Sequence, residues 1–218
     1  MNKSFKLVSS FLGLLLLSAC SFFGEPANVE IASYKVIKKQ DNIEIREYEG
    51  LVMASTVVDG SFDDMANPAF RRLFKYISGA NKGQAPIAMT SPVFMEEGGK
   101  KIAMTSPVIG QKTGSQSWKM SFVLPSTYTK ATAPKPEDSL IKIESLPKRQ
   151  VAAITFAWWM NEENIEKYKT QLSGWLRQNK YSFDVNRYEV AGYNPPWTLP
   201  PVRRNEVIIP LSKQQSGE

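Results

Sequence analysis

The chain has 218 residues, of which 27 are Lys or Arg and 21 are Asp or Glu, with one cysteine and no histidine. A single cysteine excludes an intramolecular disulfide bond, and the lack of histidine removes Ser-His and Cys-His nucleophilic sites and the usual zinc-ligand spacings. The formal net charge of +6 is dispersed and contains no run of five like charges, which argues against nucleic-acid binding.

The first segment, Met1–Ala19, has the three zones of a secretory signal. Lys3 and Lys6 give it a positive start, and Leu7–Leu17 is mostly apolar but shorter than the about 20 residues that span a hydrocarbon core. Small residues then precede Cys20, and the junction resembles the lipobox of bacterial lipoproteins. The alternative is an ordinary signal peptide followed by a chance cysteine.

The lipobox resemblance implies that Cys20 becomes the acylated first residue of the mature protein. Several acyl chains would hold it firmly, because each buried methylene contributes about 0.8 kcal/mol. An Asp directly after the cysteine would favour retention at the inner membrane. Ser21 stands there instead, which predicts that the protein is located at the periplasmic face of the outer membrane. In a Gram-positive host this distinction would not apply. Without Lys3 and Lys6 the mature chain keeps 25 basic against 21 acidic residues, a net charge of +4, which suits anionic ligands or lipid headgroups.

After a tether at residues 20–32, the first half of the chain predicts strands around one helix. Apolar residues at three- and four-residue spacing predict a helix over Phe62–Ser78, with Ser61 as N-cap and Gly79 as C-terminal stop. Pro68 inside this pattern predicts that the helix begins near it or bends there. The strands are expected from Tyr34 onward and at Ile43–Tyr48, Leu51–Val58, Ile87–Met95, Lys101–Gln111 and Ser117–Leu124.

The second half repeats this plan after a proline-containing loop at Thr129–Asp138. A second amphipathic helix is expected over Glu162–Asn179, and strands are expected at Leu140–Leu146, Val151–Phe156, Asp184–Tyr193 and Glu206–Leu211. Two such units predict one pseudo-symmetric α+β domain over residues 33–212, in which helices cover apolar faces of largely antiparallel sheets. Residues 213–218 form a tail.

A seven-residue segment, Ile87–Val93, recurs without change as Ile102–Val108. The simplest account is a copied hairpin whose alternating Ile, Met and Val fill one face of the sheet. Each copy carries a proline, which cannot donate a ladder hydrogen bond, so Pro92 and Pro107 are expected at strand edges or bulges.

The sequence resembles the SOUL family of haem-binding proteins. The matching segments, in the family's order, are Ile43–Tyr48, Phe70–Asn81, Met89–Val93, Tyr193–Pro196 and Arg203–Val207. The resemblance implies a distorted β-barrel of two βαββ-type repeats flanked by two helices, a fold shared with gyrase-inhibitor-like effector-binding domains.

The resemblance also implies a protein that binds haem or related tetrapyrroles without catalysing a reaction. It places the ligand in a shallow cleft between the first helix and the loop that joins the last two strands. Apolar loop residues would face the ring, and arginines would pair bidentately with the propionates. The expected ligand-binding residues are Met65, Pro68, Ala69 and Arg72 on the helix, and Tyr193, Pro196, Trp197, Arg203 and Arg204 on the loop.

Several of these residues have a second interpretation. Met65 and Ala69 fit equally well as partly buried helix residues, and Arg203 and Arg204 fit ion pairs with Glu206 or loop caps somewhat better than propionate contacts. Trp158 and Trp159, which precede the second helix, are interpreted as core and rim packing rather than as ligand-stacking residues.

The chain departs from the family in the residues available to haem iron. Iron is usually held by His, Cys, Met or Tyr. Histidine is absent and Cys20 is assigned to lipid, so Met65 and Tyr193 are the nearest candidates. Binding without a protein ligand to the iron, driven by burial of the ring, is equally compatible.

Three other functions remain open on the sequence. One is binding of other amphipathic molecules by a periplasm-facing, effector-binding-like pocket. Another is hydrolysis by a single pocket carboxylate, for which Glu206 is the candidate. The third is a structural envelope protein that binds a protein partner.

Overall fold

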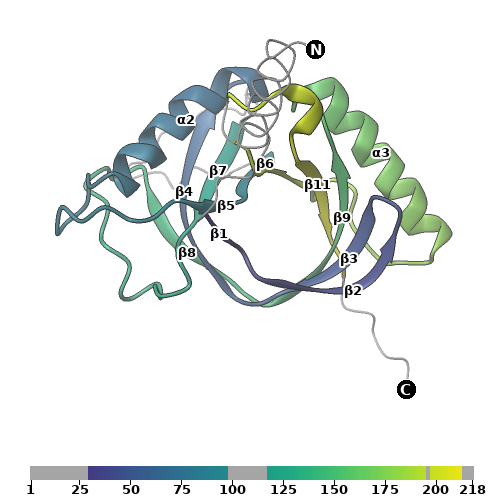
Figure 1. The fold of residues 1–218 in the computed structure, drawn as a ribbon, viewed down its shortest axis with the longest axis horizontal. Helices are drawn as coiled ribbons and strands as arrows, with labels where there is room; N and C mark the ends of the chain where they lie inside the picture. Colours follow the sequence, from purple (N-terminus) through teal and green to yellow (C-terminus); the bar gives the residue numbers. More distant parts are fainter. Residues whose placement is uncertain (1–28, 98–116, 195–196, 213–218) are drawn as a thin grey trace, which may run out of the picture.

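The computed structural model describes residues 29–97, 117–194 and 197–212 and confirms an α+β architecture: a curled sheet with a helix against each half (Figure 1). The helices are α2 (Phe62–Ile77) and α3 (Glu162–Gln178), and a short 3-10 helix spans Pro200–Val202. The strands are β1 (Glu30–Ile31), β2 (Tyr34–Gln40), β3 (Ile43–Tyr48), β4 (Leu51–Asp59), β5 (Thr90–Ser91), β6 (Val93–Glu97), β7 (Ser117–Val123), β8 (Lys142–Leu146), β9 (Arg149–Phe156), β10 (Glu189–Gly192) and β11 (Asn205–Pro210).

The main sheet has nine strands in the order β2-β3-β9-β11-β10-β6-β7-β4-β8, and all its described pairs are antiparallel. Apart from the edge strand β2, the sheet consists of two four-stranded parts, β10-β11-β9-β3 and β6-β7-β4-β8. Their strand orders match, as the internal repeat predicts. β3 pairs with β9 of the second half, and β8 pairs with β4 of the first. Each half of the sequence therefore contributes one strand to the part of the sheet that the other half mainly forms, and the two repeats form one body.

Helix α2 begins at Phe62, as the apolar spacing and Ser61 predict, and of the two alternatives for Pro68 a helix start near the proline is wrong. The Ser61 side chain accepts a hydrogen bond from the Asp64 backbone N–H, and two aspartates occupy the first turn, where the helix dipole favours negative charge. This cap fixes the start of the helix. Pro68 lies in the interior, where the ring costs a backbone hydrogen bond that packing of the buried face must offset.

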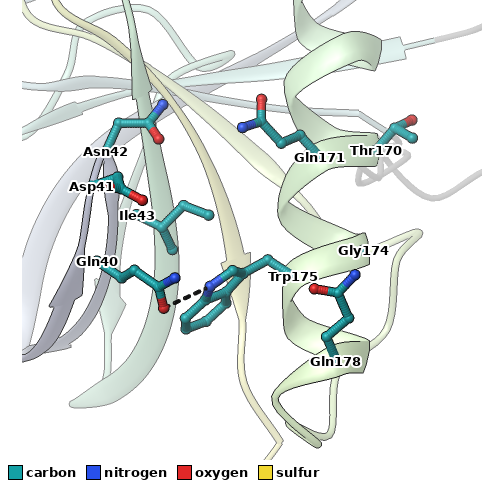
Figure 2. Close-up of a pocket in the computed structure, with 9 residues that line it drawn as sticks. All are labelled: Gln40, Asp41, Asn42, Ile43, Thr170, Gln171, Gly174, Trp175 and Gln178. Carbon is teal, nitrogen blue, oxygen red and sulfur yellow. Dashed lines mark hydrogen bonds between the residues drawn. The ribbon is translucent and has the colours of Figure 1, made fainter.

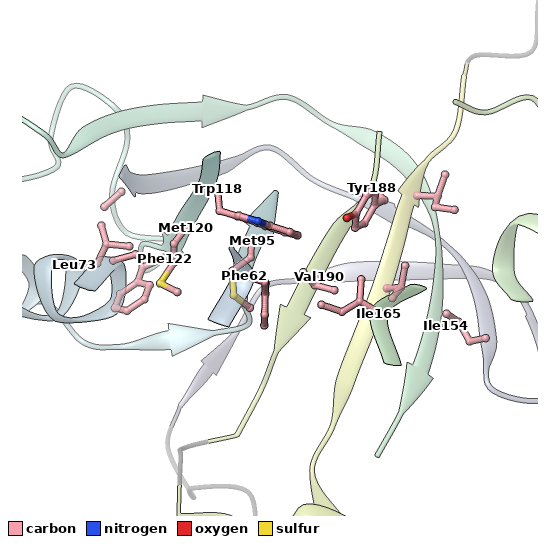
Figure 3. Packing of buried hydrophobic residues seen from close by; sticks show 14 of the residues in the cluster. Phe62, Leu73, Met95, Trp118, Met120, Phe122, Ile154, Ile165, Tyr188 and Val190 are labelled. Atoms are coloured by element: carbon pink, nitrogen blue, oxygen red, sulfur yellow. The ribbon is translucent and has the colours of Figure 1, made fainter. Parts of the chain in front are cut away.

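Both helices pack their apolar faces on the outer face of the curled sheet. Helix α3, capped by Asn161, buries Ile165, Leu172 and Leu176 against β9 and β11. At the junction of the halves, Phe62 of α2 meets the Trp118 ring edge to face at 5.1 Å. The resulting core is continuous across both halves (Figure 3).

The inner face of the sheet carries a second, smaller cluster. Because side chains alternate along a strand, neighbours of outer-core residues point inward. Tyr48, Phe94, Ala153, Tyr193 and Ile208 pack together there. Polar residues share this face, and they form the charge cluster described below.

Two of the expected strands are shorter in the structure than in the prediction. Of the expected strand Ile87–Met95, only Thr90–Ser91 and the part from Val93 onward are strand, and Pro92 between them has no ladder position, as its missing N–H requires. The expected strand Asp184–Tyr193 is only Glu189–Gly192. The leader, Cys20, Lys101–Gln111 and the second repeat copy lie outside the described residues. Within the described residues, no helix is long and apolar enough to cross a membrane.

Candidate functional site

The loop between β10 and β11 lies against the segment that leads into α3. The Trp158 backbone N–H donates to the Pro200 carbonyl at 2.7 Å, and the Asn205 side chain donates to the Trp158 carbonyl at 2.9 Å. These bonds join two segments that are distant in sequence. They also hold Trp158 at a φ of 76°, a left-handed conformation that is costly for a bulky residue.

The joined segments expose a group of apolar side chains that we call the aromatic surface. The exposed fractions are 56% for Trp158, 53% for Trp159, 82% for Trp197, 56% for Leu199 and 44% for Val202. The core part of the core-and-rim interpretation of Trp158 and Trp159 is therefore wrong, because both side chains are more than half exposed, whereas a position at the rim agrees with these fractions. Grouped apolar exposure of this kind marks a binding surface more often than scattered single residues do.

Arg203 brings a cation to the aromatic surface. Its guanidinium carbon lies 4.5 Å from the centroid of the Trp159 ring, and its Nε donates to the Thr198 carbonyl at 2.8 Å. The first contact is a cation–π interaction and the second fixes the side chain. A positive charge is thus held in place beside exposed indoles.

Arg204, the next residue, faces the inner side of the sheet and binds Glu206. Glu206 is fully buried and accepts two hydrogen bonds from Arg46, at 2.7 and 2.9 Å, and two from Arg204, at 3.1 and 2.9 Å. The Tyr193 hydroxyl donates to the same carboxylate at 2.8 Å. We call these four residues the Glu206 cluster.

Opposing effects set the protonation of the Glu206 cluster. Burial alone would raise the pKa of Glu206, but the hydrogen bonds and charges of Arg46 and Arg204 outweigh it and lower that pKa. Burial and then the Glu206 charge raise the pKa of Tyr193. The cluster is therefore a carboxylate held by two guanidinium groups and a neutral phenol. Glu206 is paired on every side and out of contact with solvent, which is a structural arrangement and not that of a pocket nucleophile or base.

The structure distributes the expected ligand-binding residues over separate places. Trp197 and Arg203 belong to the aromatic surface, whereas Tyr193 and Arg204 belong to the Glu206 cluster, as the ion-pair interpretation of Arg204 predicts. Arg72 donates to the Thr56 hydroxyl at 2.9 Å and pairs with Asp138 at 3.3 Å, so its partners lie in the other half of the sheet.

Of the remaining expected residues, the two whose side chains the structure describes lie apart from the aromatic surface. Ala69 is fully buried in the outer core, and Pro68 is exposed on α2. Pro196 and the side chain of Met65 lie outside the described part of the structure. In the described residues, no group of three His, Cys, Asp or Glu residues could hold a metal ion.

Comparison with known proteins identifies the family. The sequence model described as SOUL heme-binding protein matches residues 29–210, nearly all of the described chain. The chain belongs to the SOUL heme-binding protein family. This SOUL protein is 32% identical to Heme-binding protein 1 of Xenopus tropicalis over 192 residues, which cover 86% of the chain and 93% of the relative. It is 29% identical to Heme-binding protein 2 of Homo sapiens over 175 residues, 79% of the chain and 78% of the relative.

Solved structures share the fold of this SOUL protein. The C-terminal domain of EcmrR aligns with a TM-score of 0.54 at 13% identity, over 83% of the chain and 98% of that domain. A structure named as a hydrolase from Listeria innocua aligns with a TM-score of 0.51 at 8% identity, over 81% of the chain and 94% of its own length. At such identities the likeness concerns the fold alone.

Leu199 and Val202 of the SOUL protein were not singled out in the sequence. Leu199 directly precedes the 3-10 helix Pro200–Val202, and Val202 ends it. The loop that contains them also carries the exposed Trp197. Apolar residues in a loop are a weak signal by themselves, because about half of any protein surface is apolar. Only the contact between the loop and Trp158 shows that they extend one surface.

Proposed function

We propose that this protein binds haem or a related tetrapyrrole, non-covalently and without catalysing a reaction, on the aromatic surface. The observation that carries the proposal is the exposure of Trp158, Trp159 and Trp197 on two segments joined by hydrogen bonds, beside the fixed cation of Arg203. Membership of the SOUL family and the names of the relatives support the ligand class.

The residues of this surface fit the chemistry of a porphyrin. A flat apolar ring gains about 25 cal/mol for each Å² that it and the protein remove from water. Indole faces offer such area with little loss of side-chain freedom, and the Arg203 guanidinium matches a propionate carboxylate. Bound haem would supply iron, and the protein would supply orientation and partial exclusion of water.

The proposal assigns no protein ligand to the iron. The chain has no histidine, and the Tyr193 hydroxyl donates to Glu206 from a buried position. A bond from Tyr193 to iron would break that hydrogen bond and require a phenolate, which burial disfavours. We therefore expect the porphyrin to be held by its faces and its propionates.

A second candidate function is binding of other amphipathic molecules on the same surface. The apolar side chains of the aromatic surface have no feature that demands a porphyrin, and the fold is shared with the EcmrR C-terminal domain. Competition between haemin and a neutral hydrophobic dye separates the two functions. A specific tetrapyrrole site releases the dye on addition of stoichiometric haemin, whereas a general apolar site prefers neither.

We also propose that Cys20 carries lipid and holds the protein at the periplasmic face of an outer membrane. The support is the leader and lipobox pattern of the sequence. In fractionated cells, Cys20→Ser should move the protein out of the membrane fraction, and density-gradient separation should place the unaltered protein with outer-membrane markers. An unchanged distribution of the variant would remove the anchor from the account.

Native mass spectrometry of the full-length protein, purified from its own membrane without added haem, tests the ligand class. The expected result is a retained mass equal to that of haem or of another tetrapyrrole. A retained lipid or other amphiphile of different mass would favour the second candidate function.

A further inference from the structure

A groove separates the β2–β3 turn from α3, away from the aromatic surface (Figure 2). Its volume is about 330 Å³, within the range of small-ligand sites. Figure 2 shows the turn on one side, the helix on the other, and the Trp175 side chain reaching across between them. The lining residues are Gln40, Asp41, Asn42, Ile43, Thr170, Gln171, Gly174, Trp175 and Gln178.

Carboxamide groups dominate the lining. Gln40 and Asn42 extend from the turn, and Gln171 and Gln178 extend from the helix. The side chains of Gln171 and Gln178 are exposed and make no hydrogen bond to the other described residues, so their donors and acceptors are free to bind a ligand. A primary amide donates two hydrogen bonds and accepts two, which matches a partner that does both.

Gly174 leaves space in the helical wall of the groove. A Cβ atom built on it meets no heavy atom within 4 Å, so packing of the described residues does not require a glycine there. In a helix interior glycine costs about 1 kcal/mol relative to alanine. The residue therefore weakens α3 while keeping the groove wide.

Trp175 forms a fixed apolar wall. Its indole N–H donates to the Gln40 side chain at 3.1 Å, its ring stacks on Tyr181 at 5.7 Å between centroids, and the Lys38 ammonium lies 5.1 Å from the ring centroid. Ile43 lines the groove on the strand side but belongs to the core and is only 6% exposed. Gln40 is held by Trp175, and the Asn42 side chain donates to the Thr155 carbonyl at 2.9 Å, so these two amides are in place before any ligand arrives, which lowers the cost of binding.

We propose that this groove binds a neutral carbohydrate chain. Sugar hydroxyls donate and accept hydrogen bonds as the amides do, and the C–H edges of a pyranose ring suit the apolar wall. The lining itself has no Lys or Arg, and the adjacent Lys38 is engaged by the Trp175 ring and by Asn179. One carboxylate is too few for a metal site, and the polar walls do not suit a porphyrin. The groove faces the second half of α3, whereas Trp159 precedes its first turn, so this site is independent of the tetrapyrrole surface.

Calorimetric titration of the full-length protein with chitotetraose, maltotetraose and cellotetraose tests the proposal. At least one of these neutral tetrasaccharides should bind. Gly174→Leu should weaken its affinity by about tenfold or more by filling the groove, and Gln171→Leu should weaken it by a similar factor by removing one amide. Both substitutions favour helix, so circular dichroism should confirm that α3 is retained.

Two controls separate the groove from other sites. Gly174→Ala adds a methyl group in open space and should keep the affinity within about twofold, while Trp159→Ala should leave it unchanged. Failure of all three sugars to bind would overturn the proposal, as would equal affinity of the protein and its Gly174→Leu variant. Binding of hexaglycine in their place would identify a peptide groove and would also overturn it.

Discussion

Arg203 and Arg204 are adjacent in sequence, yet they belong to two regions of opposite character. Arg204 lies two residues before Glu206 and so points to the same inner face of the sheet, where it joins a buried carboxylate. Arg203 lies over the exposed Trp159 ring on the aromatic surface. The difference shows that two neighbouring arginines in a motif need not belong to one site. The arginine that pairs with the buried Glu206 stabilises the fold, and the other lies at the surface.

The largest expected effect comes from the Glu206 cluster. Glu206→Gln leaves Arg46 buried without its counter-charge, and breaking a buried ion pair in this way costs about 3–5 kcal/mol. The free energy of unfolding, measured by urea titration, should fall by that amount. The control is Glu96→Gln, because Glu96 pairs with Lys119 while its side chain is 43% exposed. This substitution should change the free energy of unfolding by about 1 kcal/mol or less. Equal effects at both sites would contradict the structural role of Glu206.

Arg204→Met and Arg203→Met compare the two regions directly. Loss of the Arg204 hydrogen bonds to Glu206 should cost about 1.5–3 kcal/mol, less than loss of the carboxylate because Arg46 remains. Arg203→Met should change the free energy of unfolding by about 0.5 kcal/mol or less and should instead weaken haemin binding. The comparison fails if Arg204→Met alone reduces haemin affinity while the fold keeps its stability.

The Glu206 cluster also predicts how stability depends on pH. Because the pKa of Glu206 lies below its ordinary value of 4.5 in the folded protein, the unfolded chain binds the proton more readily. This contribution is complete above the ordinary value and is lost as pH falls through the lowered one. Urea midpoints measured from neutral pH into this acid range should decline.

The double variant Arg46→Met/Glu206→Leu is the control for the pH series. It removes the titrating carboxylate and its main counter-charge together, so its urea midpoints should decline less steeply with acid. A decline as steep as that of the unaltered protein would assign the acid sensitivity to other carboxylates.

Much of the fold follows from sequence periodicity. Ile43–Tyr48 is a strand with the expected bounds, and the two helices differ from expectation by one residue at their C-terminal ends. Periodicity reports which side of an element is buried, but it does not name the partner strand. The exchange of β3 and β8 between the halves therefore emerges only from the structure.

The site was less predictable than the fold. The family resemblance predicts Trp197 and Arg203, whereas the position of Trp158 and Trp159 before the second helix predicts core and rim packing. The position of Trp158 depends on its left-handed backbone and on its bonds to Pro200 and Asn205. No local pattern of residues encodes a contact between segments about forty residues apart.

The smallest expected change in stability lies on the aromatic surface. Trp197 is 82% exposed, so Trp197→Ala should alter the free energy of unfolding by about 0.5 kcal/mol or less. The same substitution removes one face available to a porphyrin. It separates binding from folding more cleanly than any substitution in the Glu206 cluster.

Haemin titration of the full-length protein, followed by the Soret band against a matched detergent blank, tests the central claim most directly. The account predicts a saturable Soret shift, weakened by about tenfold or more in the Trp159→Ala/Trp197→Ala variant and retained in Phe74→Ala, an exposed aromatic residue on α2. No Soret shift with the unaltered protein, or an equal shift in all three proteins, would contradict a tetrapyrrole site on the aromatic surface.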